Sequence, residues 1–186
     1  MTTTRQRLTL EEFLELPEWK PALEYADGRV SQKVSPKGKH STLQLAFCEL
    51  FNRFARPARL ALALPALRAT WNDRSYVPDV SVYGWEQAPR DESGEVADDF
   101  VDPPDIAIEI VSSGQGAPKL VQKCLWYIAN GVLVALLVNP ARKSIPLFRP
   151  HQSTVTRRGD DGIDLRDVLP GLELTVHQVF DSLKLE

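Results

Sequence analysis

Two acidic side chains stand in segments that are otherwise largely apolar. Asp79 lies in residues 77–83, Val-Pro-Asp-Val-Ser-Val-Tyr, and Glu109 lies in residues 104–111, Pro-Asp-Ile-Ala-Ile-Glu-Ile-Val. Both segments have the composition of buried strands, in which an ionised carboxylate is costly unless it is paired or bound to a cation. Two such carboxylates on neighbouring strands also repel each other, and a shared divalent metal relieves both problems. An acidic pair that holds a metal is typical of sites that cleave phosphodiester bonds.

Such a site also needs a cation near the attacking water or the developing negative charge, and a lysine is the usual choice. Two residues after Glu109, on the same strand face, the chain has Val111, so the lysine must come from another element. The helix expected next carries Lys119 and Lys123. Lys123 borders the apolar stripe of this helix and can extend over the sheet toward the carboxylates, which makes it the preferred candidate, with Lys119 left open.

Two further residues are candidates for the same site. Glu24 stands between a leucine and a tyrosine just before a hairpin turn, which is a poor place for a charge without a partner. His40 lies on the apolar stripe of a predicted helix and either hydrogen-bonds into the site or packs at the helix start. Taken singly, Asp79 also fits a strand edge and Lys123 a surface position. The order of all these residues along the chain favours a site.

The elements that position these residues follow from periodicity and turn signals. With 186 residues, 43% of them hydrophobic, the chain is expected to form a single domain over residues 1–186. Residues 105–138 read as β-α-β, which predicts parallel neighbouring strands with a right-handed crossover. Capping boxes at Thr9–Glu12 and Thr175–Gln178 begin two helices, the first extending to Leu16. The remaining expectations are a hairpin around Asp27-Gly28, a helix whose apolar stripe runs over 43–54 with His40 at its start, strands over 59–64, 66–72, 143–149 and 153–157, and a loop over 84–103.

Composition also limits the function classes. The 22 Lys and Arg against 25 Asp and Glu give a formal net charge of −3, which does not favour a non-specific nucleic-acid binder. Cys48 and Cys124 fall in helical apolar patterns without C-x-x-C spacing, as expected of small buried residues in a reducing compartment. Residues 1–7 lack an apolar signal-peptide core, and no run is long enough to span a membrane, so we expect a cytoplasmic protein.

Five segments in a fixed order carry a family resemblance: residues 23–30, 35–36 with His40, 77–82, 104–112 and 123–132. This set resembles the PD-(D/E)XK nuclease superfamily and, within it, the Uma family of restriction-endonuclease-like proteins. The resemblance implies a restriction-endonuclease-like α/β (α+β) core, with a mixed β-sheet flanked by helices. It also implies a homodimer and DNA cleavage that depends on Mg²⁺, with Mn²⁺ as a substitute. The implied metal ligands are Asp79 and Glu109, with Lys123 moved onto the helix and Glu24 as an accessory acid.

Two other interpretations stay open at this point. One is a catalytically weak or inactive nuclease-fold protein that binds nucleic acid or a protein partner. The other is a buried acid–lysine network that has a structural role alone. Carboxylates of Asp79 and Glu109 that converge, with Lys123 pointing at them, favour the endonuclease; carboxylates that point apart, or Lys123 in solvent, favour the binding protein.

Overall fold

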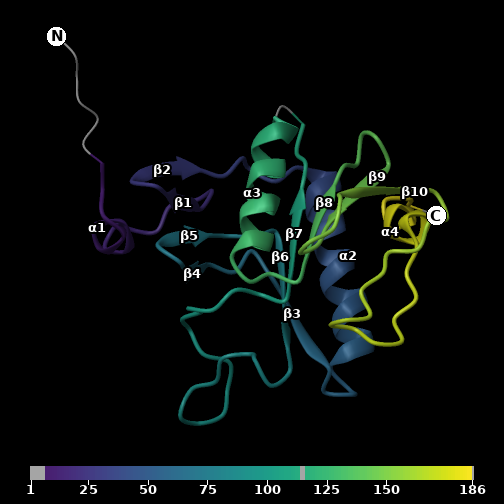
Figure 1. The fold of residues 1–186 in the computed structure, drawn as a ribbon, viewed down its shortest axis with the longest axis horizontal. Helices are drawn as coiled ribbons and strands as arrows, with labels where there is room; N and C mark the ends of the chain where they lie inside the picture. Colours follow the sequence, from purple (N-terminus) through teal and green to yellow (C-terminus); the bar gives the residue numbers. More distant parts are fainter. Residues whose placement is uncertain (1–6, 114–115, 186) are drawn as a thin grey trace.

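The computed structural model describes residues 7–113 and 116–185, and within them ten strands form two sheets (Figure 1). The predicted mixed sheet is the larger one. Its strand order is β10 (Val155–Arg158), β9 (Ser144–Phe148), β8 (Val134–Val138), β7 (Ile106–Ile110), β6 (Val80–Gly84) and β3 (Ala61–Pro65). The second sheet, which was not predicted, has the order β2 (Arg29–Gln32), β1 (Leu23–Ala26), β5 (Arg74–Tyr76) and β4 (Ala69–Trp71).

The β-α-β prediction is confirmed. Strands β7 and β8 pair in parallel, with Ile106 opposite Val134 and Ile110 opposite Val138. Every residue of both strands is buried, as expected for strands covered on both faces. Helix α3 (Ala117–Ala129) makes the crossover between them and ends before Gly131, which has a φ of +105° that suits glycine. Part of the turn predicted before α3, residues 114–115, lies outside the described residues.

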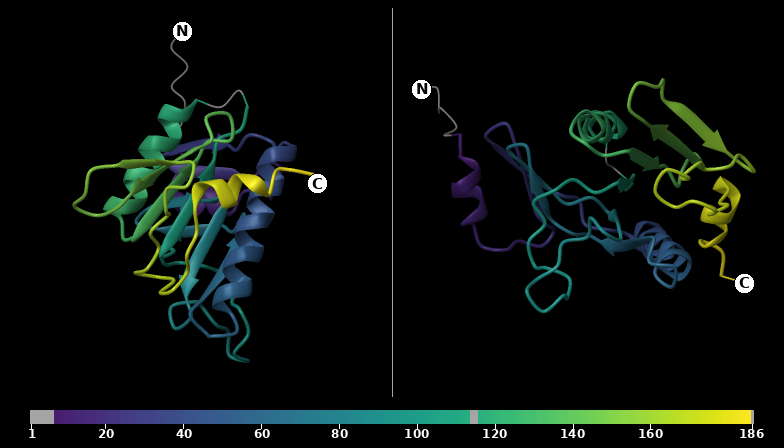
Figure 2. Two further views of the ribbon diagram at one scale, coloured as in Figure 1. Left: turned by 90° about the vertical axis from the view of Figure 1, so that its right-hand side faces the viewer. Right: turned by 60° about the horizontal axis from the view of Figure 1, so that its bottom comes forward.

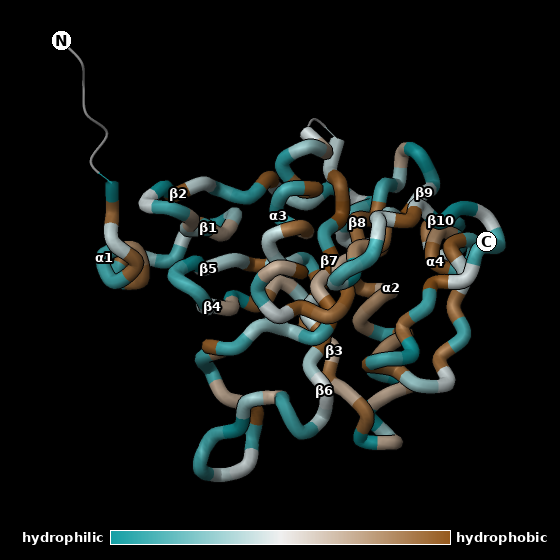
Figure 3. Tube along the Cα trace, viewed as in Figure 1, coloured by the Kyte–Doolittle hydropathy of each residue, from teal (hydrophilic) through white to brown (hydrophobic). Residues whose placement is uncertain are grey.

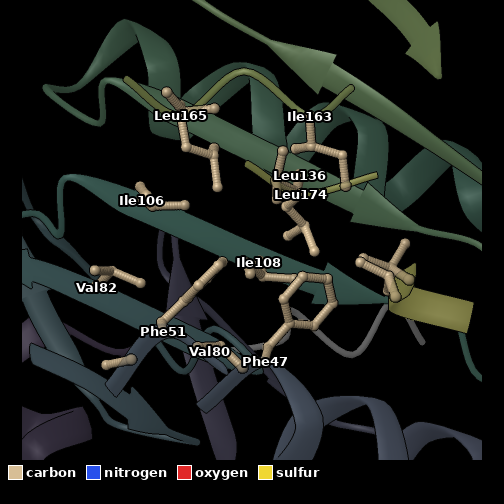
Figure 4. Packing of buried hydrophobic residues seen from close by; sticks show 14 of the residues in the cluster. Phe47, Phe51, Val80, Val82, Ile106, Ile108, Leu136, Ile163, Leu165 and Leu174 are labelled. Atoms are coloured by element: carbon tan, nitrogen blue, oxygen red, sulfur yellow. The ribbon is translucent and has the colours of Figure 1, made fainter. Parts of the chain in front are cut away.

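Two helices cover opposite faces of the six-stranded sheet (Figure 2). Helix α2 (Gly38–Ala55) packs Phe47 and Phe51 against Val80 and Ile108 (Figure 4). Helix α3 packs on the other face, where the alternate residues of the same strands point. Figure 3 shows that hydrophobic residues concentrate in the central strands, whereas much of the outer loops is hydrophilic.

The smaller sheet consists of two hairpins that pair through β1 and β5. The Asp27-Gly28 turn is confirmed, and both of its residues have positive φ, as a two-residue hairpin turn requires. The second hairpin turns at Asn72-Asp73, again with positive φ at both residues. Because Asn-Asp is a weaker hairpin signal than Asn-Gly, the sequence predicts a strand over 66–72 and no separate strand before the one that holds Asp79. The structure has β4 within 66–72 and, after the turn, the additional strand β5.

The remaining elements follow the sequence with small changes of boundary. Both capping boxes are present, at the start of α1 (Leu10–Leu14) and of α4 (Val176–Asp181). Helix α1 ends at Leu14, two residues earlier than predicted. Residues 85–105 form a loop in which the described contacts include one isolated bridge, Arg90 with Val96. Among the described residues, no helix has the length and apolar character needed to cross a bilayer.

Candidate active site

The two acidic residues of the central strands lie side by side on the face that α3 covers. Strands β6 and β7 pair with Ser81 opposite Ala107, and Asp79 directly precedes β6. The alternation of strand side chains therefore places Asp79 and Glu109 on one face. The N–H of Asp79 donates to Ile108 O at 2.9 Å, and the N–H of Ile110 donates to Asp79 Oδ2 at 2.7 Å. Asp79 is 4% exposed and Glu109 1% exposed, so both carboxyl groups are buried.

Lys123 extends from α3 to two of the predicted acids. Its Nζ lies 2.7 Å from Glu109 Oε1 and 2.6 Å from Glu24 Oε1. The rings of Tyr76 and Tyr127 flank the ammonium, with centroids 5.1 and 5.7 Å away. Lys119, the alternative that the sequence left open, is exposed.

Glu24 is held in place from the smaller sheet. It is buried on β1, and its Oε1 accepts the N–H of Val77 at 2.9 Å in addition to the Lys123 ammonium. Val77 belongs to the segment between β5 and β6, so this hydrogen bond ties the hairpin sheet to the start of the Asp79 strand. The structure thus brings all four predicted residues into one buried cluster, and their catalytic roles stay predictions.

Three residues that the sequence did not place with the acids contact them. Lys33 Nζ lies 2.7 Å from Asp79 Oδ1 and 3.8 Å from Glu109 Oε2, and donates to Val77 O at 2.5 Å. The hydroxyl of Tyr127 donates to Glu109 Oε1 at 2.8 Å. The side-chain amide of Gln44 donates to Asp79 O at 2.7 Å.

Local sequence patterns indicate the positions of two of these residues, Lys33 and Tyr127. The two-residue turn fixes Glu24 opposite Ser31, and alternation along the return strand then puts Lys33 on the same hairpin face as Glu24. Tyr127 lies four residues after Lys123 on α3, and residues at that spacing share a helix face. The hairpin register thus places Lys33 near Glu24, and the helix period places Tyr127 near Lys123, but neither pattern predicts that the hairpin meets the Asp79 strand.

His40 contacts the same acids from α2. Its Nε2 lies 3.0 Å from Asp79 Oδ2, which agrees with the first of the two alternatives that the sequence left open for His40. Among the described residues, no group hydrogen-bonds to the buried Nδ1 of His40. Asp79 is therefore contacted by a lysine, a histidine and the Ile110 N–H at its two carboxyl oxygens.

The protonation of the cluster follows from burial and ion pairing. Burial alone would raise the pKa of Asp79, but Lys33 and His40 outweigh it and hold that pKa well below its ordinary value. Burial raises the pKa of Glu109 above its ordinary value, against the lowering effect of Lys123 and Lys33. Burial alone would lower the pKa of Lys123, yet Glu109 and Glu24 raise it above its ordinary value. Lys123 is therefore an ammonium at neutral pH, which suits charge stabilisation and not proton abstraction.

Two carboxylates of the cluster converge on one point. Asp79 Oδ1 and Glu109 Oε2 both point at the Lys33 ammonium, so two hard oxygen ligands of the kind that Mg²⁺ prefers converge on one point. Among the described residues, no group of three or more His, Cys, Asp or Glu side chains is arranged to hold a metal. The donor set fits a divalent ion with two protein ligands, provided that the Lys33 ammonium leaves that point.

The mixed sheet flanked by helices, with its buried acid–lysine cluster, defines a restriction-endonuclease-like fold. Residues 10–177 match the Uma2 family, which is described as putative restriction endonuclease, and the chain belongs to this family. This match confirms the resemblance seen in the sequence.

A solved structure gives the same result for the fold. The crystal structure of a putative nuclease belonging to DUF820 from Anabaena variabilis ATCC 29413 superposes with a TM-score of 0.92 at 36% identity. The match covers 95% of this chain and 99% of that one. A comparison with curated proteins finds no match.

Proposed function

We propose that the chain is a Mg²⁺-dependent DNA endonuclease that hydrolyses phosphodiester bonds, with Mn²⁺ as an alternative metal. The observation that carries this proposal is the convergence of Asp79 and Glu109 from adjacent strand segments with Lys123 from the following helix. The fold and the family support a nuclease function, and the chemistry of the cluster supports the finer assignment.

Each residue of the cluster has a distinct role in this proposal. Asp79 and Glu109 would hold the metal, which when bound polarises the phosphate and lowers the pKa of a water molecule. Lys123 stays protonated and stabilises the negative charge that develops on the phosphate. Glu24 orients Lys123 through the 2.6 Å contact, and the Tyr127 hydroxyl fixes the orientation of the Glu109 carboxylate.

A cavity that His40 lines is the proposed place where a polyanion approaches the cluster. This cavity, of about 410 Å³, lies between the start of α2 and the segments that follow β7 and β8, and Lys37, Lys39, His40 and Asn139 are among its lining residues. His40 connects the cavity to Asp79. The two lysines give this surface a positive character despite the net charge of −3. A larger cavity, of about 530 Å³, lies at α1 and the 85–105 loop and includes neither the cluster residues nor His40, so it is not the proposed substrate site.

We also propose that the protein is a homodimer, because two copies of one site related by a two-fold axis can address both strands of a duplex. The exposed side chains of Leu14, Trp19 and Val101 provide apolar surface of the kind that a dimer buries. Light scattering coupled to size-exclusion chromatography gives the mass directly. A monomeric mass at micromolar concentration would contradict this part of the proposal.

The proposal is tested with linear and supercoiled DNA in Mg²⁺ or Mn²⁺. We expect cleavage by the wild type and a loss of about 100-fold or more in Glu109→Gln, because one metal ligand is lost. The matched control is Glu92→Gln, which alters an exposed glutamate of the 85–105 loop and should cleave like the wild type. Equal cleavage by all three preparations would identify a contaminating nuclease and contradict the proposal.

A second candidate is a purely structural acid–lysine network, which is favoured by the fact that both lysines of the cluster are already ion-paired. Thermal unfolding with added Mg²⁺ or Mn²⁺ separates the two functions, because a ligand that binds the folded state raises the melting temperature. The endonuclease proposal predicts a rise that Asp79→Ala abolishes. An unchanged melting temperature in millimolar metal would favour the structural network.

A further inference from the structure

The Lys33 ammonium lies at the point where the two proposed metal ligands converge. Its Nζ is 2.7 Å from Asp79 Oδ1 and 3.8 Å from Glu109 Oε2. A divalent ion bound to both oxygens needs contacts of about 2.0–2.6 Å, which leaves no room for an ammonium group between the same atoms. The ion and the ammonium therefore exclude each other.

We propose that Lys33 is a built-in counterion of the metal-free site, which a divalent cation displaces when it binds. The inference rests on the proposed function, because it concerns the same two carboxylates. It gives Lys33 a positioning role: the side chain keeps Asp79 and Glu109 oriented toward one point while the metal is absent. It also sets the metal affinity, because binding includes the free energy of moving the ammonium away.

The two lysines of the cluster differ in how firmly they are held. Lys123 has two carboxylates within 2.7 Å, is flanked by two tyrosine rings, and its side chain is 9% exposed. Lys33 has one carboxylate at 2.7 Å and a second only at 3.8 Å, its other short contact is to the neutral Val77 carbonyl, and its side chain is 16% exposed. The displaced cation is therefore Lys33, whereas Lys123 stays in place.

The charge of the cluster favours a divalent ion that replaces the Lys33 ammonium over one that binds beside it. Three carboxylates, of Asp79, Glu109 and Glu24, face the ammonium groups of Lys33 and Lys123. With His40 counted as neutral, the set has a formal charge of −1. A divalent ion added beside both lysines would bring it to +1 in a buried site, whereas an ion that replaces the Lys33 ammonium leaves it neutral. Because uncompensated buried charge is costly, exchange is the favoured route.

The location of Lys33 allows this exchange without unfolding. Lys33 follows β2, which is an edge strand of the smaller sheet, and its backbone N–H donates to Ala22 O at 2.9 Å. The backbone thus stays paired while the flexible four-carbon side chain rotates. The Lys33 side chain is 16% exposed, so part of it already reaches solvent.

Manganese binding to the full chain without DNA tests the proposal. We expect Lys33→Met to bind Mn²⁺ about tenfold tighter or more than the wild type in isothermal titration calorimetry, because the binding-competent state no longer requires displacement. The control is Lys119→Met, which removes the exposed positive charge of α3 and should change the affinity by no more than about twofold, since exposed charges are screened. Asp79→Asn should abolish binding in either background.

Each outcome of this titration decides the question. Equal or weaker binding by Lys33→Met, with measurable binding by the wild type, overturns the displacement inference and leaves the metal site standing. A similar gain in Lys119→Met also overturns it, because the effect would then be one of overall charge. Absence of binding in both the wild type and Lys33→Met overturns this inference together with the metal-dependent function.

Lysine labelling of the wild type gives an independent test that does not depend on the folding of a variant. An amine-acetylating reagent is applied with and without saturating Mg²⁺, and each lysine is quantified by mass spectrometry. We expect Mg²⁺ to increase the labelling of Lys33 several-fold while Lys123 stays protected. Labelling of Lys33 that is unchanged or reduced at saturating metal would overturn the inference.

Discussion

The two faces of the six-stranded sheet are built from the same strands but bury different kinds of side chain. On the α2 face, Val80, Ile106, Ile108 and Ile110 belong to one hydrophobic cluster with residues of α2. On the α3 face, the alternate positions include Glu109, with Asp79 beside it, and both carboxyl groups are buried there. Alternation along a strand thus places neighbouring residues in two different environments, an apolar cluster on one face and a buried charged cluster on the other.

The largest expected effect is on the α2 face. Phe51 is fully buried, so Phe51→Ala should lower the free energy of unfolding by about 3–5 kcal/mol, measured by urea denaturation. Leu45, on the same helix and 59% exposed, is the control, and Leu45→Ala should stay within about 0.5 kcal/mol of the wild type. Metal binding by the folded fraction of Phe51→Ala should match the wild type. A large loss of metal affinity would show that the two faces are not independent.

On the α3 face, removal of one cation should have the next largest effect. Lys123→Met leaves Glu24 and Glu109 buried without the ammonium between them, which should destabilise the fold by roughly 3 kcal/mol. The double variant Glu24→Gln/Lys123→Met should recover part of this loss, because one unpaired carboxylate is removed as well. Additive effects of the two single substitutions in urea denaturation would show that the two groups do not interact.

The pH dependence of stability separates the carboxylate of Asp79 from the apolar face. The pKa of Asp79 is lower in the folded protein than in the unfolded chain, where it is about 4. Its ionised form therefore contributes stability above about pH 4, and this contribution is lost as the pH falls toward the folded-state pKa. The stability advantage of the wild type over Asp79→Asn should be full at neutral pH and shrink as the pH falls below 4. An advantage that grows in acid would contradict this pKa shift.

The sequence predicts the strands and the helix of the α3 face more completely than it predicts which residues join the cluster. The apolar segments around Asp79 and Glu109 and the stripe beside Lys123 gave the strands, the crossover helix and the predicted acid–lysine set, because these are local periodicities. The position of Lys33 depends in addition on the pairing of β1 with β5, which brings the hairpin to the sheet that holds Asp79. That pairing is a tertiary contact without a local pattern, and the weak Asn72-Asp73 turn signal concealed the strand that makes it.

The smallest expected effect tests whether the Tyr127 hydroxyl belongs to the chemistry or only to the packing. Tyr127→Phe removes the hydrogen bond to Glu109 Oε1 and should cost about 1 kcal/mol of stability. Tyr83→Phe is the matched control, because this buried hydroxyl donates to the Asp102 carbonyl at 3.2 Å, away from the cluster. Both variants should lose similar stability in urea denaturation, but Tyr127→Phe alone should weaken Mn²⁺ binding, because the orientation of Glu109 is no longer fixed. Equal metal affinity in the two variants would show that the Tyr127 hydroxyl contributes to packing alone. The proposed metal site would then depend on the carboxylates and lysines without it.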